Sequence, residues 1–504
     1  MRGKKTFINT AMNLLEVFVS VVCGFILPRL ILTSFGSKYN GLVTSITQFL
    51  ACAEIINSGI GGVTRAALYG PLAKKNKAEI DSIIKATDMF MKKVGLIVAG
   101  AIVAFSAIYP FFVSYEFDWC FTFSLFIIIG ISTFAKSFFG ITYLTLVQAD
   151  QRLWVSSLLR TICAVLNTIV AAILIYTVNS IHVVKLGSAV IYVIYPIVLR
   201  LYVKKRYNIN SNVEPDNKSI AHRWDALGHQ IANFVVTNTD VMVLTVFENV
   251  LQVSVYSVYS IIVNGLKKLV FSFSNGLEAA FGSMIANKEK SALKENLSLV
   301  EWIMYNMATV VYTCAIILVI PFVRIYTKGV VDVDYIRPLF SAIILIAQFF
   351  NCVRIPYQLV VQAAGHYKQT RNGAIFEAVI NLFLSIILVI KYGIVGVAIG
   401  TLVATVFRTI QYSYYVCKNI VHRSQWETVF RLIVSFIEAL GTIVIVNSLH
   451  LAQPINYRAW FVNALITLVI CCCIVVTGSF LVDRNNIKRF SQKIRIVFKR
   501  KKAD

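Results

Sequence analysis

The sequence is poor in acidic residues and lacks the motifs of common soluble enzymes. Only 24 of its 504 residues are Asp or Glu, and only six are His. It contains no phosphate-binding loop and no HExxH zinc motif, and its ten cysteines show no CxxC or Cys/His spacing. The connections between apolar runs reach only about 20 residues, too few for a catalytic domain. We therefore expect no enzyme activity, no cofactor and no metal site.

Hydrophobic residues make up 58% of the chain, and the mean hydropathy of +0.73 excludes an ordinary soluble protein. The 48 Lys and Arg give a net charge of +24, which by itself is compatible with nucleic-acid binding. Most of these basic residues lie in short connections between apolar runs, however, as they do in membrane proteins. We expect contacts with membrane lipids and none with nucleic acid.

The apolar pattern predicts about fourteen membrane-spanning helices. Connections on one side of the membrane carry 33 Lys and Arg, and those on the other side carry five. Because basic loops stay in the cytoplasm, both termini are predicted to be cytoplasmic. The predicted segments are approximately 7–33, 41–70, 89–113, 119–149, 154–178, 182–203, 223–246, 252–286, 298–323, 335–363, 371–390, 393–416, 428–449 and 459–482.

The second segment, 41–70, is long enough to span a bilayer but carries a polar face. Glu54 and Arg65 are eleven positions apart, three helical turns, with Asn57 and Gly61 between them on the same face. A charge deep in a membrane helix costs about 3 kcal/mol or more. We therefore expect this face to lie against water or protein. The glycines 59, 61 and 62 are expected to permit close approach or a break in the helix.

The same pattern returns 213 residues later with its charges exchanged. Glu54 corresponds to Lys267, and Arg65 corresponds to Glu278. In the fourth and fifth segments the offset becomes 214, so that residues 146–149 correspond to 360–363. Weak repeats with glycine-interrupted helices at corresponding positions are typical of transporters built from two related halves.

Each half holds six segments, an even number, so the halves are predicted to lie parallel around a central cleft. Asn9, Glu16 and Ser20 correspond to His222, His229 and Asn233, which extends the polar stripe; we interpret the histidines as hydrogen-bonding groups. We predict an all-α polytopic membrane protein. Its parts are an N-terminal six-helix lobe (1–206), a cytoplasmic linker (207–220), a C-terminal six-helix lobe (221–420), two further helices (421–482) and a basic cytoplasmic tail (483–504).

This organisation, with FGSKYNGLVTSITQFLACAEIINSGIGGVTRAALYGPLAKKNKAEI near its start, resembles the polysaccharide-transporter branch of the multidrug/oligosaccharidyl-lipid/polysaccharide exporter superfamily. That branch includes the bacterial O-antigen and capsule repeat-unit flippases. The resemblance implies that the first, second, seventh and eighth helices line the cleft. It also implies alternating access in the bacterial cytoplasmic membrane. The implied cargo is an undecaprenyl-diphosphate-linked oligosaccharide that moves to the outer leaflet, and the implied partners are the polymerase and glycosyltransferases of the same pathway.

Basic residues inside the predicted spans suit such a cargo. A diphosphate carries about two negative charges and must cross a low-dielectric region, where fixed cations in a wet cleft compensate it. The alternative is that each cation pairs with an acid or carbonyl of a neighbouring helix and only holds helices together. The candidate substrate-binding residues are Lys136, Arg160, Lys267, Lys268 and Arg354.

Two other functions remain open at this point. A cation-coupled multidrug exporter of the same superfamily would favour carboxylates in its cavity, such as Glu54, Asp240 and Glu278. Ten basic residues against six acids within the spans argue against it. A scaffold without transport activity would not need buried charges on repeat-related faces.

Four charged residues are candidates for gating: Glu54, Arg65, Asp240 and Glu278. The repeat predicts Arg65 and Glu278 on opposing lobes near the cytoplasm. An ion pair between them would form only when the lobes close there, and so would act as a latch. Alternatively, each acid–base pair lies within one lobe.

Overall fold

The computed structural model describes residues 2–210, 212–216, 218–219, 227–274 and 277–500, and it contains helices and no strands over these residues. Eleven of the described helices are long and apolar enough to cross a membrane. They correspond to every predicted segment except the second, seventh and eighth, three of the four segments with polar stripes. The all-α, multi-pass membrane fold is therefore confirmed.

The surface of the long helices is apolar, as expected for contact with lipid. Phe18, Phe383 and Ile437 are each exposed over more than 60% of their surface, and many other large apolar side chains are similarly open. Hydroxyl groups lie inside instead: Ser156, Thr313 and many other Ser and Thr residues are buried between helices. Since lipid is as apolar as the interior, packing and hydrogen bonds hold these helices together.

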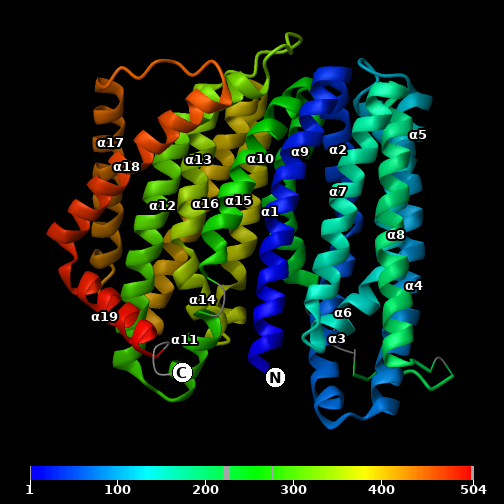
Figure 1. The fold of residues 1–504 in the computed structure, drawn as a ribbon, viewed down its shortest axis with the longest axis horizontal. Helices are drawn as coiled ribbons and strands as arrows, with labels where there is room; N and C mark the ends of the chain where they lie inside the picture. Colours follow the sequence, from blue (N-terminus) through cyan, green and yellow to red (C-terminus); the bar gives the residue numbers. More distant parts are fainter. Residues whose placement is uncertain (1, 211, 217, 220–226, 275–276, 501–504) are drawn as a thin grey trace. The chain divides into compact units, whose positions relative to one another are not determined.

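The chain forms two compact units, which are described separately (Figure 1). Unit 1 comprises Met1–Ser257 and Gly329–Val333. Its elements are α1 (Arg2–Phe35), α2 (Ser37–Ala53), α3 (Ile55–Lys74), α4 (Lys77–Ile108), the 3₁₀ turn η1 (Tyr109–Phe112), α5 (Trp119–Ala135), the π-helical segment η2 (Lys136–Gly140), α6 (Ile141–Ala149), α7 (Leu153–Thr177), α8 (Ile181–Tyr207), α9 (Leu227–Phe247) and the first turns of α10 (Val250–Ser272).

Unit 2 comprises Val258–Lys328 and Asp334–Asp504. Its elements are the rest of α10, α11 (Leu277–Ala286), α12 (Lys290–Tyr326), α13 (Pro338–Val353), α14 (Ile355–Ala363), α15 (Tyr367–Tyr392), α16 (Ile394–Asn419), α17 (Trp426–Ser448), α18 (Tyr457–Val482) and α19 (Arg484–Arg500). The compact units thus divide inside α10, whereas the repeat divides the chain in the linker 207–220. Contacts of α2 with α9 and α10 account for the difference.

The two six-helix repeats are confirmed by the helix bounds. Adding 214 to the bounds of α6 gives those of α14, and the same offset takes the start of α7 to the start of α15. Helix packing repeats as well: α3 lies on α6 as α11 lies on α14, and α5 lies on α8 as α13 lies on α16. The sequence offset therefore reports a real structural repeat.

Several spans are interrupted, and in the second span the interruption lies at Glu54, since α2 ends at Ala53 and α3 begins at Ile55. Of the two possibilities expected for the glycine cluster 59–62, a break does not occur, because the cluster lies within α3. A close approach does occur at Gly61, where a Cβ would lie 3.7 Å from Thr145 of α6. In the eighth span, α10 ends at Ser272 and α11 begins at Leu277.

The fourth and tenth spans are interrupted at matching positions. In the fourth, the π-helical segment η2 ends at Gly140, and 214 residues later Arg354 separates α13 from α14. Pro356 follows at once, and its missing N–H and bulky ring prevent the helix from running on. Lys136 and Arg354 therefore lie at helix interruptions and not in the middle of regular helices.

The two additional helices are anchored to unit 2 by buried ions. Glu301 of α12 is fully buried, and it pairs with Arg423, which precedes α17, and with Arg431 of α17 at 2.5 Å. Arg431 also reaches Asp483 after α18, at 3.0 Å. The carboxylate of Glu301 is thus shared between two guanidinium groups.

Candidate functional site

The polar face of the second span lies against the fourth span of the same unit. Lys136 Nζ is 2.6 Å from Glu54 Oε2, and Asn57 donates a hydrogen bond of 2.7 Å to Ser137. Further along α3, Arg65 donates a hydrogen bond of 3.0 Å to Gln148 of α6. The face predicted from spacing therefore exists, and its partners are the η2 segment and α6.

The Glu54–Lys136 pair is open on one side. The two side chains keep 31% and 51% of their surface exposed. An exposed ion pair contributes little to stability, because water competes with it and its ordering costs entropy. Lys136 can therefore exchange Glu54 for another anion at small cost.

A second ion pair in unit 1 joins α7 to α1. Arg160 Nε is 2.9 Å from Glu16 Oε1, and a second guanidinium nitrogen lies 3.2 Å from Oε2 of the same carboxylate. The guanidinium therefore faces both oxygens of the carboxylate, and the contact of the second nitrogen is a hydrogen bond.

In unit 2 two arginines share one carboxylate. Arg354 Nη1 is 2.6 Å from Glu377 Oε1, and Arg408 Nε is 3.4 Å from Oε2 of the same carboxylate. Arg408 also stacks on the ring of Tyr412 and donates to its hydroxyl at 2.8 Å. The cluster carries one net positive charge in a largely buried place.

The remaining predicted cations lie in α10. Lys267 lies 5.6 Å from the ring centre of Phe271, and Lys268 is exposed. Within the described residues, neither lysine has a carboxylate partner at ion-pair distance. Lys267 and Lys268 therefore add two further positive charges to unit 2.

The candidate gating residues are in different situations. Asp240 of α9 is buried and accepts a hydrogen bond of 2.8 Å from Tyr256 of α10, within unit 1. Glu278 of α11 is exposed. Arg65 and Glu278 belong to different units, so the latch between them stays a prediction. Of the two histidines, His222 lies outside the described residues and His229 lies in α9.

Sequence reasoning assigned no role to several residues that complete this site. The residues not singled out from the sequence as binding residues are Glu377, Arg408, Ser137 and Gln148. Gln148 did carry a signal, because it lies in the segment 146–149 that repeats at 360–363.

No family model matches the chain, and no curated protein matches it in sequence. Solved structures do match it in fold. A structure titled "Lipid II flippase MurJ, inward closed conformation" superposes with a TM-score of 0.74 at 14% identity, covering 95% of this chain and 100% of that one.

Two transporters of the MATE type also match. An inward-facing multidrug resistance MATE transporter of the MOP superfamily gives a TM-score of 0.64 at 14% identity, covering 79% of this chain and 96% of that one. The Vibrio cholerae transporter VcmN, in its bent form, gives 0.56 at 14% identity, covering 82% of this chain and 97% of that one. The chain therefore shares the fold of these three solved structures.

Proposed function

We propose that this protein is a flippase that moves a polyprenyl-diphosphate-linked oligosaccharide from the cytoplasmic to the outer leaflet by alternating access. The excess of cations over carboxylates among the candidate residues of the two units carries the proposal. Glu16, Glu54 and Glu377 each hold at least one cation, while Arg65, Lys267 and Lys268 have no acidic partner in the part of the chain that the structure describes.

The chemistry of the cargo fits this charge pattern. A diphosphate entering the membrane loses hydration and needs fixed positive groups to compensate its charge. The exposed Lys136 and the unpaired Lys267 are available for this contact without loss of a buried ion pair. The likeness to a lipid II flippase is compatible with a lipid-linked substrate.

The likeness to MATE transporters is equally compatible with the alternative, a cation-coupled multidrug exporter. The flippase is favoured because most of the candidate carboxylates already contact basic or hydrogen-bonding side chains. A site for organic cations needs free acids, but Glu54 and Glu377 bind basic side chains, and Asp240 accepts a hydrogen bond from Tyr256. Of the candidate acids, Glu278 is exposed and is the one that such a site could use.

The cellular setting belongs to the same proposal. We place the protein in the bacterial cytoplasmic membrane with both termini in the cytoplasm, beside the polymerase and glycosyltransferases that use the same lipid carrier. The protein itself has no catalytic role. A C-terminal epitope should be cleaved by protease in inverted vesicles and protected in intact spheroplasts.

Single variants test the function. In a strain lacking the chromosomal gene, Lys136→Ala, Lys267→Ala and Arg354→Ala should insert normally, lose surface polysaccharide and accumulate lipid-linked precursor inside. Lys→Arg changes should be milder, since charge matters before geometry. Lys391→Ala, at the end of α15, is the matched control and should export normally.

Full export by all three alanine variants would refute the cationic site. Unchanged polysaccharide together with increased drug sensitivity of the deletion strain would instead support the multidrug exporter.

A further inference from the structure

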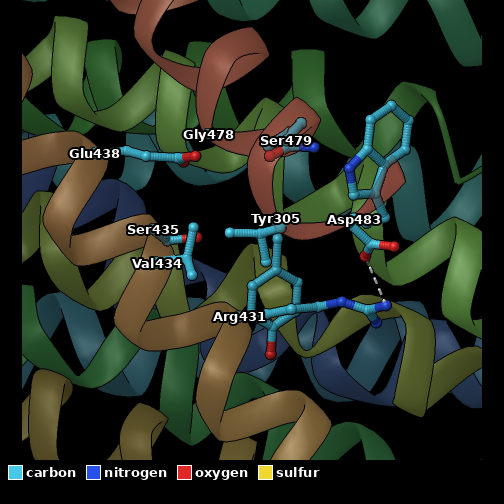
Figure 2. A pocket seen from close by; sticks show the side chains of 11 residues that line it. Tyr305, Arg431, Val434, Ser435, Glu438, Gly478, Ser479 and Asp483 are labelled. Carbon is cyan, nitrogen blue, oxygen red and sulfur yellow. Dashed lines mark hydrogen bonds and ion pairs between the residues drawn. The ribbon is translucent and has the colours of Figure 1, made fainter. Parts of the chain in front are cut away.

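A small cavity lies inside unit 2, between α12, α17 and α18 (Figure 2). Its volume is about 20 Å³, measured as the space open to the centre of a water molecule, which is enough for one water. Polar groups from all three helices line it: Trp302, Tyr305, Arg431, Ser435, Glu438 and Ser479.

Glu438 has no partner for its charge. The residue is 5% exposed, and both carboxylate oxygens are buried without a hydrogen bond from any described residue. Figure 2 shows the side chain pointing from α17 toward Gly478 and Ser479 of α18. A Cβ at position 478 would lie 2.1 Å from Glu438 Oε1, so glycine there makes room for the carboxyl group.

The basic residue among those that line the cavity is already engaged. Arg431 lies seven residues before Glu438, about 10 Å along the helix axis at 1.5 Å per residue. Its guanidinium contacts Glu301 at 2.5 Å and Asp483 at 3.0 Å. The other titratable groups that line the cavity and the adjoining groove are Tyr305 of α12, Cys473 of α18 and Asp483. Cys471 of α18 also lies near Glu438 and is hydrogen-bonded to Cys314 of α12. None of these groups is a cation.

An ionised carboxylate without hydrogen bonds or counter-charge is very costly inside a membrane protein, whereas the neutral acid is not. We propose that Glu438 is a membrane-embedded protonation site, occupied by a proton in the arrangement seen here. The proton is bound from water and returned to water, and no other bond changes.

The cavity supplies the route for that proton. Ser435 lies one turn from Glu438 on the same helix, and Arg431 one turn further. The buried indole N–H of Trp302 has no acceptor among the described residues, and it is therefore free to bind a water in the cavity. One water there would form the first step of a path from Glu438 toward the Arg431–Asp483 pair. This site is independent of the cargo and of the cations proposed to bind it.

Carbodiimide labelling tests the proposal. Dicyclohexylcarbodiimide, an apolar reagent, adds to protonated carboxyl groups and leaves ionised ones unmodified. The full-length protein would be labelled in membranes between pH 6 and 9, and the adduct located by peptide mass spectrometry.

Glu427, which begins the same helix and keeps 46% of its side chain exposed, is the matched control. At pH 7 we expect about tenfold more adduct on Glu438 than on Glu427, since an ordinary glutamate with a pKa of about 4.3 is almost fully ionised there. The Glu438 adduct should decrease toward pH 9.

Equal labelling of the two residues at pH 7 would overturn the proposal. So would protection of Glu438 by sodium at constant pH, because the site would then bind a metal cation. As a second measurement, the melting temperature of the wild-type protein should fall as the pH rises from 6 to 9, because the folded state holds a proton that the unfolded state has released. Glu438→Gln should remove this slope, and an unchanged slope in that variant would also contradict the proposal.

Discussion

Glu377 binds Arg354 through one carboxylate oxygen, at 2.6 Å, and Arg408 through the other, at 3.4 Å. The carboxylate is the shared counter-charge of two largely buried guanidinium groups. Its removal would leave two like charges close together, whereas removal of Arg354 would leave a balanced pair. The two changes should therefore have unequal effects on stability.

We predict that Glu377→Gln lowers the free energy of unfolding by about 3 kcal/mol, the usual cost of breaking a buried pair by removing one partner. Arg354→Ala should cost less, since Arg408 still balances Glu377. Thermal melting of the detergent-solubilised variants measures the difference. Equal losses in the two variants would show that Arg408 does not share the carboxylate.

The pair of Glu54 and Lys136 allows a test that separates binding from structure. The double variant Glu54→Lys with Lys136→Glu keeps an ion pair between the same two positions. If Lys136 serves only to hold the helices together, the exchange should restore export that Lys136→Glu removes. Under the proposed function it should restore the amount of folded protein in the membrane and leave export defective.

Lys136→Arg with Glu54 unchanged is the control, and it should export near the wild-type level. Export by the exchanged variant at the wild-type level would rule out a direct contact between Lys136 and an anionic cargo.

The sequence predicted the polar face of the second span but not what it contacts. Helical periodicity places Glu54, Asn57 and Arg65 on one side of a segment whatever that side meets. Their partners Lys136 and Gln148 are more than 80 positions away along the chain, and periodicity carries no information about such distant neighbours. For the same reason, the sequence did not indicate that Glu377 is the partner of Arg354.

The internal repeat of the sequence predicted more of the structure than the local pattern of residues within one segment did. The offset of 214 predicted equivalent helices, and the structure extends the equivalence to the break at Gly140 and Arg354. The break at Glu54 could not be read in the same way. Glycine permits a helix to bend without requiring it, and Gly61 stays helical with Thr145 of α6 close to where its Cβ would be, at 3.7 Å.

A close approach of two helices in unit 1 gives a prediction with an internal control. A Cβ on Gly41 of α2 would lie 1.7 Å from the carbonyl oxygen of Val250 at the start of α10, whereas a Cβ on Gly62 of α3 would meet nothing within 4 Å. We expect Gly41→Ala to lower stability by about 1–3 kcal/mol, as overpacking does. Gly62→Ala should be neutral or slightly stabilising, since alanine is the better helix former.

Melting temperatures of the two variants in the same detergent provide the comparison. If Gly41→Ala melted no lower than Gly62→Ala, α2 and α10 would not be in the close contact described here.

The last prediction concerns which part of the chain α9 moves with. The repeat assigns α9 to the C-terminal lobe, whereas its contacts place it in unit 1 with α2. The hydroxyl oxygens of Ser45 in α2 and Thr245 in α9 are 2.6 Å apart and buried. The sulfur atoms of two cysteines at these positions would therefore lie close to the 2.05 Å separation of a disulfide bond.

If the lobes of the repeat separate during transport, this contact must open once in each cycle. Oxidation of the Ser45→Cys, Thr245→Cys double variant should then block export, reductant should restore it, and each single variant should be insensitive to both. Export that continued with the disulfide formed would show that α2 and α9 stay together throughout, and the moving lobes would have to be divided inside α10 instead.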